Sequence, residues 1–214
     1  MKDIRVIDVF VMPKAMKITG RTSSITNAFV NAIVPSVSPT EAEVAEALRI
    51  LGLAAEDLRC AYCGDKSTEW DHLRPLVQGK RPTGFISEIA NLVPACGKCN
   101  QSKGSQDWRT WIVSTAKRSP AARGVPDLDE RIARLGAYEH WREPTRIDFE
   151  SIVPNGLWEQ YWKSHEGLVR GMKDCQAVAD QVRREIADKV KVQQFAGEDQ
   201  ATQVPFRTKP LFRA

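Results

Sequence analysis

The chain has 214 residues, a formal net charge of +4, 42% hydrophobic residues and five cysteines. This length and composition fit a globular protein with a sizeable core, and they exclude both a disulfide-dependent miniature and a wholly disordered chain. No apolar run reaches the roughly 18–20 residues that a membrane span needs. Because an acid and an arginine interrupt residues 3–5, a secretory signal is not expected either. We therefore expect a soluble, cytoplasmic protein with no membrane partner.

The N-terminal part of the chain predicts a strand and two helices. Residues 2–12 alternate apolar and charged side chains and favour a strand. Residues 22–34 predict a short helix, and residues 39–51 predict a clearer one with apolar positions at helical spacing. For this second helix we expect Ser38 as the N-cap and Gly52 at the end.

The C-terminal half is predicted to be mostly helical, with helices over residues 105–117, 127–142 and 157–192. In the first of them Trp108 and Trp111 share one side, where they are expected to pack in the core rather than stack on bases. The last contains Gly167 and Gly171, and we expect a break near one of them. The basic tail, residues 204–214, is expected to be mobile unless it binds something.

Four of the cysteines form two pairs, Cys60-x-x-Cys63 and Cys96-x-x-Cys99, which are separated by 32 residues. Disulfides are rare in the reducing interior of cells. Two such thiolate pairs that meet around one ion form the tetrahedral sulfur site that Zn²⁺ prefers. The spacing therefore predicts a structural zinc site with these four ligands. Cys175 stands alone and is expected to be a small packed side chain.

Between and within the two pairs lie residues suited to hydrolysis of a phosphodiester. This reaction needs an activated water, a cation near the phosphate and help for the leaving oxygen. His72 is a candidate general base, because a neutral imidazole has an unperturbed pKa of about 6.5. Asp71 and Asn100 offer a carboxylate and an amide oxygen, which are ligands that suit Mg²⁺ or Mn²⁺.

The same residues resemble the HNH endonucleases, the ββα-metal nucleases, in the form whose two strands and one helix are held by a four-cysteine zinc. The resemblance covers residues 60–104. It rests on the Asp-His pair, the downstream Asn91, a second asparagine nine residues later and both cysteine pairs, all in the family's order. The chain departs from the family's motif at its last position, which is Asn100 rather than histidine. This departure affects the strength and metal preference of that ligand.

The resemblance implies a role for each matching residue. Asp71 and Asn100 would hold the catalytic Mg²⁺ or Mn²⁺, and His72 would activate the water. Asn91 would brace the loop that carries the histidine. Asn100 would also open the helix that crosses under the strands, and a helix N-terminus there favours phosphate. By position alone, the candidates for phosphate binding are Arg74, Lys98 and Lys103.

The expected fold is α+β, with a ββα-metal nuclease core held by the zinc, an N-terminal strand and helix scaffold, and a mostly helical C-terminal half. We divide the chain into an N-terminal scaffold, a nuclease core, a helical region and a basic tail, at residues 1–59, 60–118, 119–203 and 204–214. The scaffold carries seven charges of each sign, whereas residues 98–123 carry six basic residues and one acid. Positive charge therefore gathers beside the expected site, where it favours binding of nucleic acid.

The leading hypothesis is a divalent-metal-dependent endonuclease that acts on DNA as a restriction-type or defence nuclease, with double-stranded DNA as the expected partner. Cutting both strands with one site per chain requires a homodimer or sequential nicking, and the helix after Leu157 offers an interface. Two alternatives stay open. One is a zinc-knuckle protein that binds nucleic acid without cutting it, and the other is an RNA-specific or structure-specific nuclease with the same chemistry.

Overall fold

The computed structural model describes residues 15–198, with side-chain exposure given up to residue 190. The predicted strand over residues 2–12 and the basic tail lie outside these residues. Residues 23–166 form one compact unit, and the other described residues, 15–22 and 167–198, belong to a second unit. No helix in the described part of the chain is both long and apolar enough to cross a membrane.

Two helices precede the cysteines, as predicted. A 3₁₀ turn, η2 (Ile18–Arg21), leads into α1 (Thr22–Asn31), and α2 (Glu41–Leu51) follows. The N-cap of α2 is Thr40 and not Ser38, because Thr40 and Glu43 form a reciprocal capping box with a 2.7 Å bond from the Thr40 N–H to the Glu43 carboxylate. Gly52 ends the helix with a left-handed backbone, φ +64°, as its position predicted.

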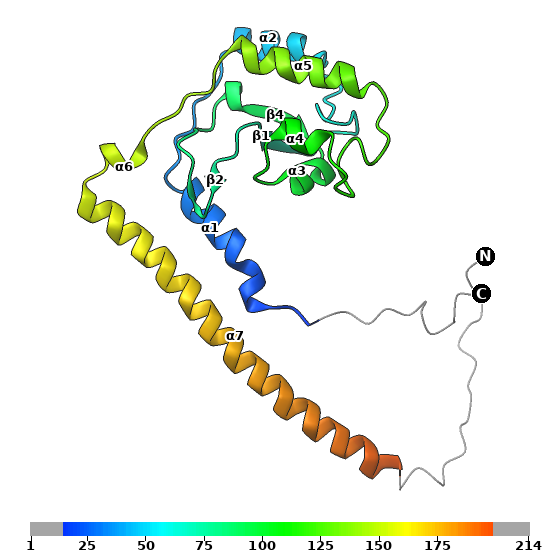
Figure 1. Cartoon of the computed structure of the whole chain (residues 1–214), viewed down its shortest axis with the longest axis vertical. Coiled ribbons are helices and arrows are strands. Elements are labelled where there is room, and N and C mark those ends of the chain that lie inside the picture. Colours follow the sequence, from blue (N-terminus) through cyan, green and yellow to red (C-terminus); the bar gives the residue numbers. More distant parts are fainter. Residues whose placement is uncertain (1–14, 199–214) are drawn as a thin grey trace, which may run out of the picture. The chain divides into compact units, whose positions relative to one another are not determined.

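The segment with the cysteine pairs contains two antiparallel strands followed by a helix, which confirms the α+β expectation. β1 (Glu69–His72) pairs with β4 (Leu92–Ala95), with Asp71 opposite Val93 and His72 opposite Leu92. α3 (Gly97–Lys103) comes directly after β4 and packs against β1 (Figure 1). This arrangement brings the second cysteine pair and Asn100 to the strand that carries Asp71 and His72.

A small hairpin that the sequence analysis did not predict lies between β1 and β4 along the chain. It consists of β2 (Val77–Gln78) and β3 (Arg81–Pro82). The turn between them holds Gly79 and Lys80, both with positive φ, +57° and +66°. Positive φ at both central residues is the requirement of a tight type I′ hairpin turn. A short 3₁₀ turn, η3 (Ile89–Asn91), then leads into β4.

The C-terminal half is helical, but two of its helices differ from the prediction. α4 (Trp108–Ile112) has five residues rather than thirteen; the Asp107 side chain caps its N-terminus, and the helix ends at Val113. α5 (Leu128–Trp141) lies where predicted, and α6 (Phe149–Ile152) is an additional short helix. α7 (Asn155–Glu198) contains 44 residues.

α7 continues through Gly167 and Gly171, so the predicted break is wrong. A glycine inside a helix costs about 1 kcal/mol relative to alanine, and many good helix formers flank these two. The expectation for Cys175 is also wrong, because this side chain is exposed on α7 rather than packed.

The core of the compact unit surrounds the cysteines. α2 and α5 lie side by side above the β1–β4 hairpin (Figure 1). Trp108, Trp111 and Ile112 of α4 are fully buried in the same cluster as the four paired cysteines, which confirms that these tryptophans belong to the core. A second cluster gathers around Val30 and Trp162, where the start of α7 packs near α1. The first cluster therefore fixes the position of the site described next.

Candidate active site and metal centre

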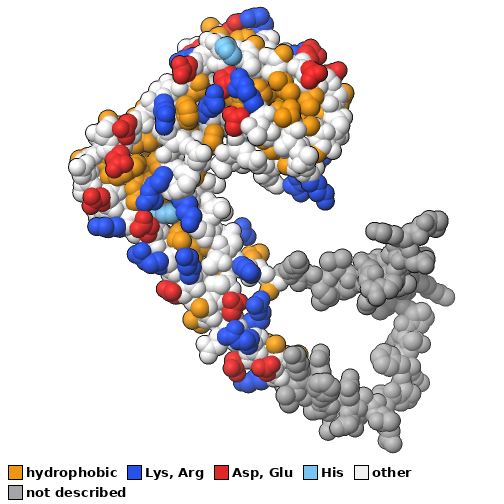
Figure 2. All heavy atoms as spheres, in the orientation of Figure 1, with side chains coloured by type: hydrophobic (Ala, Val, Ile, Leu, Met, Phe, Trp, Pro, Cys, Tyr) orange, Lys and Arg blue, Asp and Glu red, His pale blue; other side chains and the backbone are white. Residues whose placement is uncertain are grey.

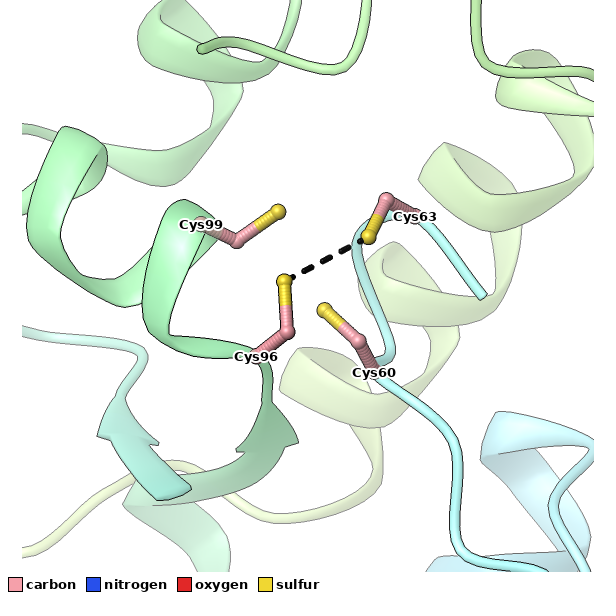
Figure 3. A group of neighbouring side chains, drawn as sticks. All are labelled: Cys60, Cys63, Cys96 and Cys99. Atoms are coloured by element: carbon pink, nitrogen blue, oxygen red, sulfur yellow. Dashed lines mark hydrogen bonds between the residues drawn. The ribbon is translucent and has the colours of Figure 1, made fainter. Parts of the chain in front are cut away.

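The four paired cysteines converge on one point. Their sulfur atoms all lie within 4.8 Å of one another and point inward (Figure 3). The Sγ atoms of Cys63 and Cys96 are 3.6 Å apart, which is far longer than a disulfide bond. Four sulfurs around a tetrahedral Zn²⁺, with Zn–S bonds of about 2.3 Å, lie roughly 3.8 Å from one another. The donor set and its spacing therefore fit a four-cysteine zinc site, as predicted from the sequence.

An arginine from outside the motif contacts this cluster. The guanidinium of Arg123 donates to Cys99 Sγ at 3.6 Å and to the Asp65 carboxylate at 2.8 Å. The neighbouring thiolates, that of Cys63 first, raise the pKa of Arg123. Zinc with four thiolates carries a net charge of about −2, so a fixed cation beside the sulfurs offsets part of that charge. Arg123 is thus placed to stabilise the loaded site.

We expect the change Arg123→Ala to weaken zinc retention by roughly 10- to 100-fold, as is typical for loss of a partner outside the ligand shell. Arg123→Lys keeps the charge but loses the forked contact to both Cys99 and Asp65, and should be intermediate. Zinc release to a coloured chelator, measured at equal protein concentration, gives the readout. Equal release from wild type and Arg123→Ala would show that the guanidinium does not support the ion.

Asp71 lies on the side of β1 that faces α3 and is only 5% exposed. Its carboxylate accepts a hydrogen bond of 2.6 Å from the Tyr62 hydroxyl and pairs with the Lys103 ammonium at 3.1 Å. Burial raises the pKa of Asp71, and the Lys103 charge acts against that rise. The burial and the two partners fix this carboxylate in the interface between β1 and α3.

Lys103 does not lie at the surface. Its side chain is fully buried, and its ammonium also donates to the His72 carbonyl at 2.8 Å. Burying an ammonium group without partners costs much free energy. The pairing with the Asp71 carboxylate therefore accounts for the buried position of Lys103. Lys103 therefore does not fit the predicted role of a phosphate contact, because no phosphate reaches it in this arrangement.

Asn100 was predicted to open the helix, but it is the fourth residue of α3. The helix begins at Gly97, and the Asn100 N–H already bonds to the Cys96 carbonyl at 3.0 Å. The Asn100 side-chain amide donates to the Glu69 carboxylate at 2.6 Å, and nothing in the described part of the chain donates to its Oδ1 atom. A Cβ atom at Gly97 would approach Glu69 Oε1 to 2.8 Å, so a larger residue there would require the Glu69 side chain to shift.

β1 and α3 therefore carry three side chains with oxygen atoms of the kind that Mg²⁺ and Mn²⁺ prefer, and two of them, Glu69 and Asn100, are in contact. These are the carboxylates of Asp71 and Glu69 and the free amide oxygen of Asn100. A carboxylate has about four lone-pair positions, so the contacts of Asp71 leave room for a further partner. The residue types of this set are those that a divalent-ion site uses.

His72 follows Asp71 in β1, where consecutive side chains point to opposite faces. Its Nε2 atom lies 2.9 Å from the hydroxyl of Ser87, and both residues are half-buried. Burial first, and then the Lys103 charge, lower the pKa of His72 to about 4. The imidazole is therefore neutral at physiological pH, which is the form in which it accepts a proton.

Asn91 is fully buried and makes three hydrogen bonds to the loop that follows His72. Its Oδ1 atom accepts from the Arg74 N–H at 2.7 Å, and its Nδ2 atom donates to the carbonyls of Arg74 and Ile86 at 3.1 and 3.2 Å. The two ends of the loop are thus tied to one side chain. The geometry suits the bracing role that the resemblance implies.

The remaining two phosphate candidates are paired with acids. Arg74 forms ion pairs with Asp107 and Glu139, and Lys98 lies 3.8 Å from Asp65. On the face shown in Figure 2, basic side chains lie among acidic ones rather than in a continuous basic field. The positive run over residues 98–123 is thus largely neutralised by neighbours that are distant in the sequence.

Four residues at the two centres were not singled out from the sequence, namely Tyr62, Glu69, Ser87 and Arg123. Glu69 had a usable signal, because it precedes Asp71 by two residues, and residues two apart in a strand share a face. The other three are ordinary residue types, and only the folded chain shows what they contact.

The comparisons with known proteins agree with this geometry. The family model described as HNH endonuclease matches residues 60–106. The chain is similar to the CRISPR-associated endonuclease Cas9 of Corynebacterium diphtheriae, with 27% identity over 153 residues. That alignment covers 67% of this chain and 13% of the relative, so the chain spans a small part of that protein's length. No solved structure matches the chain.

Proposed function

We propose, from the premise that residues 60–106 belong to the HNH endonuclease family, that this chain hydrolyses phosphodiester bonds in DNA with a divalent metal ion. The observation that carries the proposal is the shared interface of β1 and α3. There Asp71 and Asn100 present side-chain oxygen atoms, and His72, a neutral imidazole with an open nitrogen, directly follows Asp71 in β1. A structural zinc on the four cysteines holds α3 in place.

In this proposal the oxygen donors of the interface hold Mg²⁺ or Mn²⁺ against the substrate. The ion, when bound, supplies positive charge to the phosphate oxygens as the reaction proceeds. Asp71 and Asn100 are its ligands, and Glu69, which also contacts Asn100, is a third candidate. Lys103 holds the Asp71 carboxylate in place from inside the fold.

His72 accepts a proton from the attacking water at a ring nitrogen. The water oxygen forms the new bond to phosphorus, the bond from phosphorus to one ester oxygen breaks, and that oxygen leaves with a proton from solvent. A positioned general base contributes about 10²- to 10⁴-fold to such a rate. Asn91 keeps the loop after His72 closed around it.

We propose double-stranded DNA as the substrate and a defence role of the restriction type in the cytoplasm. The similar protein of C. diphtheriae is named as a CRISPR-associated endonuclease, which supports a role in defence. With one site per chain, cutting of both strands requires a homodimer or two successive nicks. The flanking residues 1–59 and 119–203 would then select the target.

The direct test is cleavage of supercoiled plasmid by the zinc-loaded protein with Mg²⁺, Mn²⁺ or EDTA, followed by separation of nicked and linear forms. We expect cleavage with either ion and none with EDTA. Matched single-stranded DNA and structured RNA distinguish the substrate classes, and preference for RNA would redirect the proposal to the second alternative. Tight binding that is indifferent to Mg²⁺, with every substrate left intact, would indicate a zinc-knuckle binding protein instead.

A further inference from the structure

His72 has two ring nitrogens with different surroundings. Nε2 lies 2.9 Å from Ser87 Oγ. Nδ1 makes no hydrogen bond to the described residues. It is not fully buried, so it is accessible to solvent. One nitrogen is therefore engaged within the fold, and the other is open to a water molecule.

The backbone of Ser87 is held in place by two hydrogen bonds. The Ser87 N–H donates to the Pro35 carbonyl at 3.0 Å, and the Ser87 carbonyl accepts from the Val37 N–H at 2.8 Å. These two bonds form a short parallel bridge between Ser36 and Ser87. Residues 35–37 lie outside the segment that matches the HNH family. The N-terminal scaffold thus fixes the residue that contacts the imidazole.

We propose that Ser87 is a positioning residue that selects the tautomer of His72. The Nε2–H group donates to Ser87 Oγ, which keeps the proton off Nδ1 and leaves its lone pair free to accept one from water. The partner of the second nitrogen sets which nitrogen of a histidine carries the proton. This inference rests on the proposed function for its catalytic meaning, but the tautomer itself is a property of the unreacted protein.

The tautomer can be read without turnover, by long-range ¹H–¹⁵N correlation spectra of the zinc-loaded protein without magnesium. The chain has three histidines, and loss of signals in His72→Gln identifies those of His72. We expect the Nε2–H form in wild type, a mixture of both forms in Ser87→Ala, and the wild-type form in Ser87→Thr. An Nδ1–H form in wild type, or no change in Ser87→Ala, would overturn the proposal.

The kinetic consequence is a loss of rate rather than of substrate binding. We expect Ser87→Ala to lower kcat about 10- to 100-fold with KM unchanged, and Ser87→Thr to restore most of it. In a double-mutant cycle, Ser87→Ala should cause no further loss when His72 is already alanine. Equal losses with and without His72 would show that Ser87 acts through general stability instead. If His72→Ala keeps full activity, the proposed function fails, whereas the tautomer measurement still decides the role of Ser87.

Discussion

Replacing His72 by alanine will lower the rate of plasmid cleavage by about 10²- to 10⁴-fold, the range that a positioned general base contributes. The reason is that His72 directly follows Asp71 in β1, and its burial keeps the imidazole neutral at physiological pH. The conversion of supercoiled to nicked plasmid with time, at saturating Mg²⁺, measures the effect.

The chain offers a matched control for this variant. His140 is exposed on α5, and its ring bonds only to the Gly136 carbonyl of its own helix. His140→Ala should therefore cleave at the wild-type rate, while both variants keep the wild-type melting temperature and zinc content. Undiminished cleavage by His72→Ala would contradict the assignment of the base.

Replacing Cys96 by serine will unfold the part of the compact unit that surrounds the zinc site. Binding of structural zinc by peptides of this kind contributes about 10–16 kcal/mol, which doubles as folding free energy. This exceeds or matches the roughly 5–15 kcal/mol by which a whole domain is usually stable. The effect should spread beyond the ligands, because the four cysteines share one core cluster with Trp108 and Trp111.

Circular dichroism melting curves and metal analysis of the purified protein measure this loss. Cys175→Ser is the matched control, because that cysteine is exposed on α7 and is not part of the cluster. The control should melt and bind zinc as wild type does. A Cys96→Ser protein with an unchanged melting curve and full zinc content would remove the argument for a structural ion.

The local part of the site was predictable because its signals lie close together in the sequence. The cysteine spacing gives the metal ligands directly, since two C-x-x-C turns meet at one ion in many folds. The order of Asp71, His72, Asn91 and the cysteines resembles the HNH endonucleases, and the family model of that description matches residues 60–106. The helix at residues 127–142 followed from periodicity alone.

The parts that could not be predicted depend on contacts between residues far apart in the sequence. Lys103 was a candidate for phosphate binding, and only the folded chain shows that it is buried and paired with the Asp71 carboxylate. The serine that contacts His72 is fixed by a bridge to residue 36, for which no local pattern exists. The start of α3 was misplaced by three residues, because the zinc turn itself initiates the helix.

The shortness of α3 has a consequence for the maturation of the protein. A helix of seven residues is not stable alone, so α3 depends on the contacts made along it. Cys99 belongs to the zinc cluster, Asn100 follows it directly, and Lys103 ends the helix at the ion pair with Asp71. We therefore expect Asn100 to become ordered only when the cysteine cluster is assembled. In the proposed nuclease, loading of the structural ion would then precede cleavage.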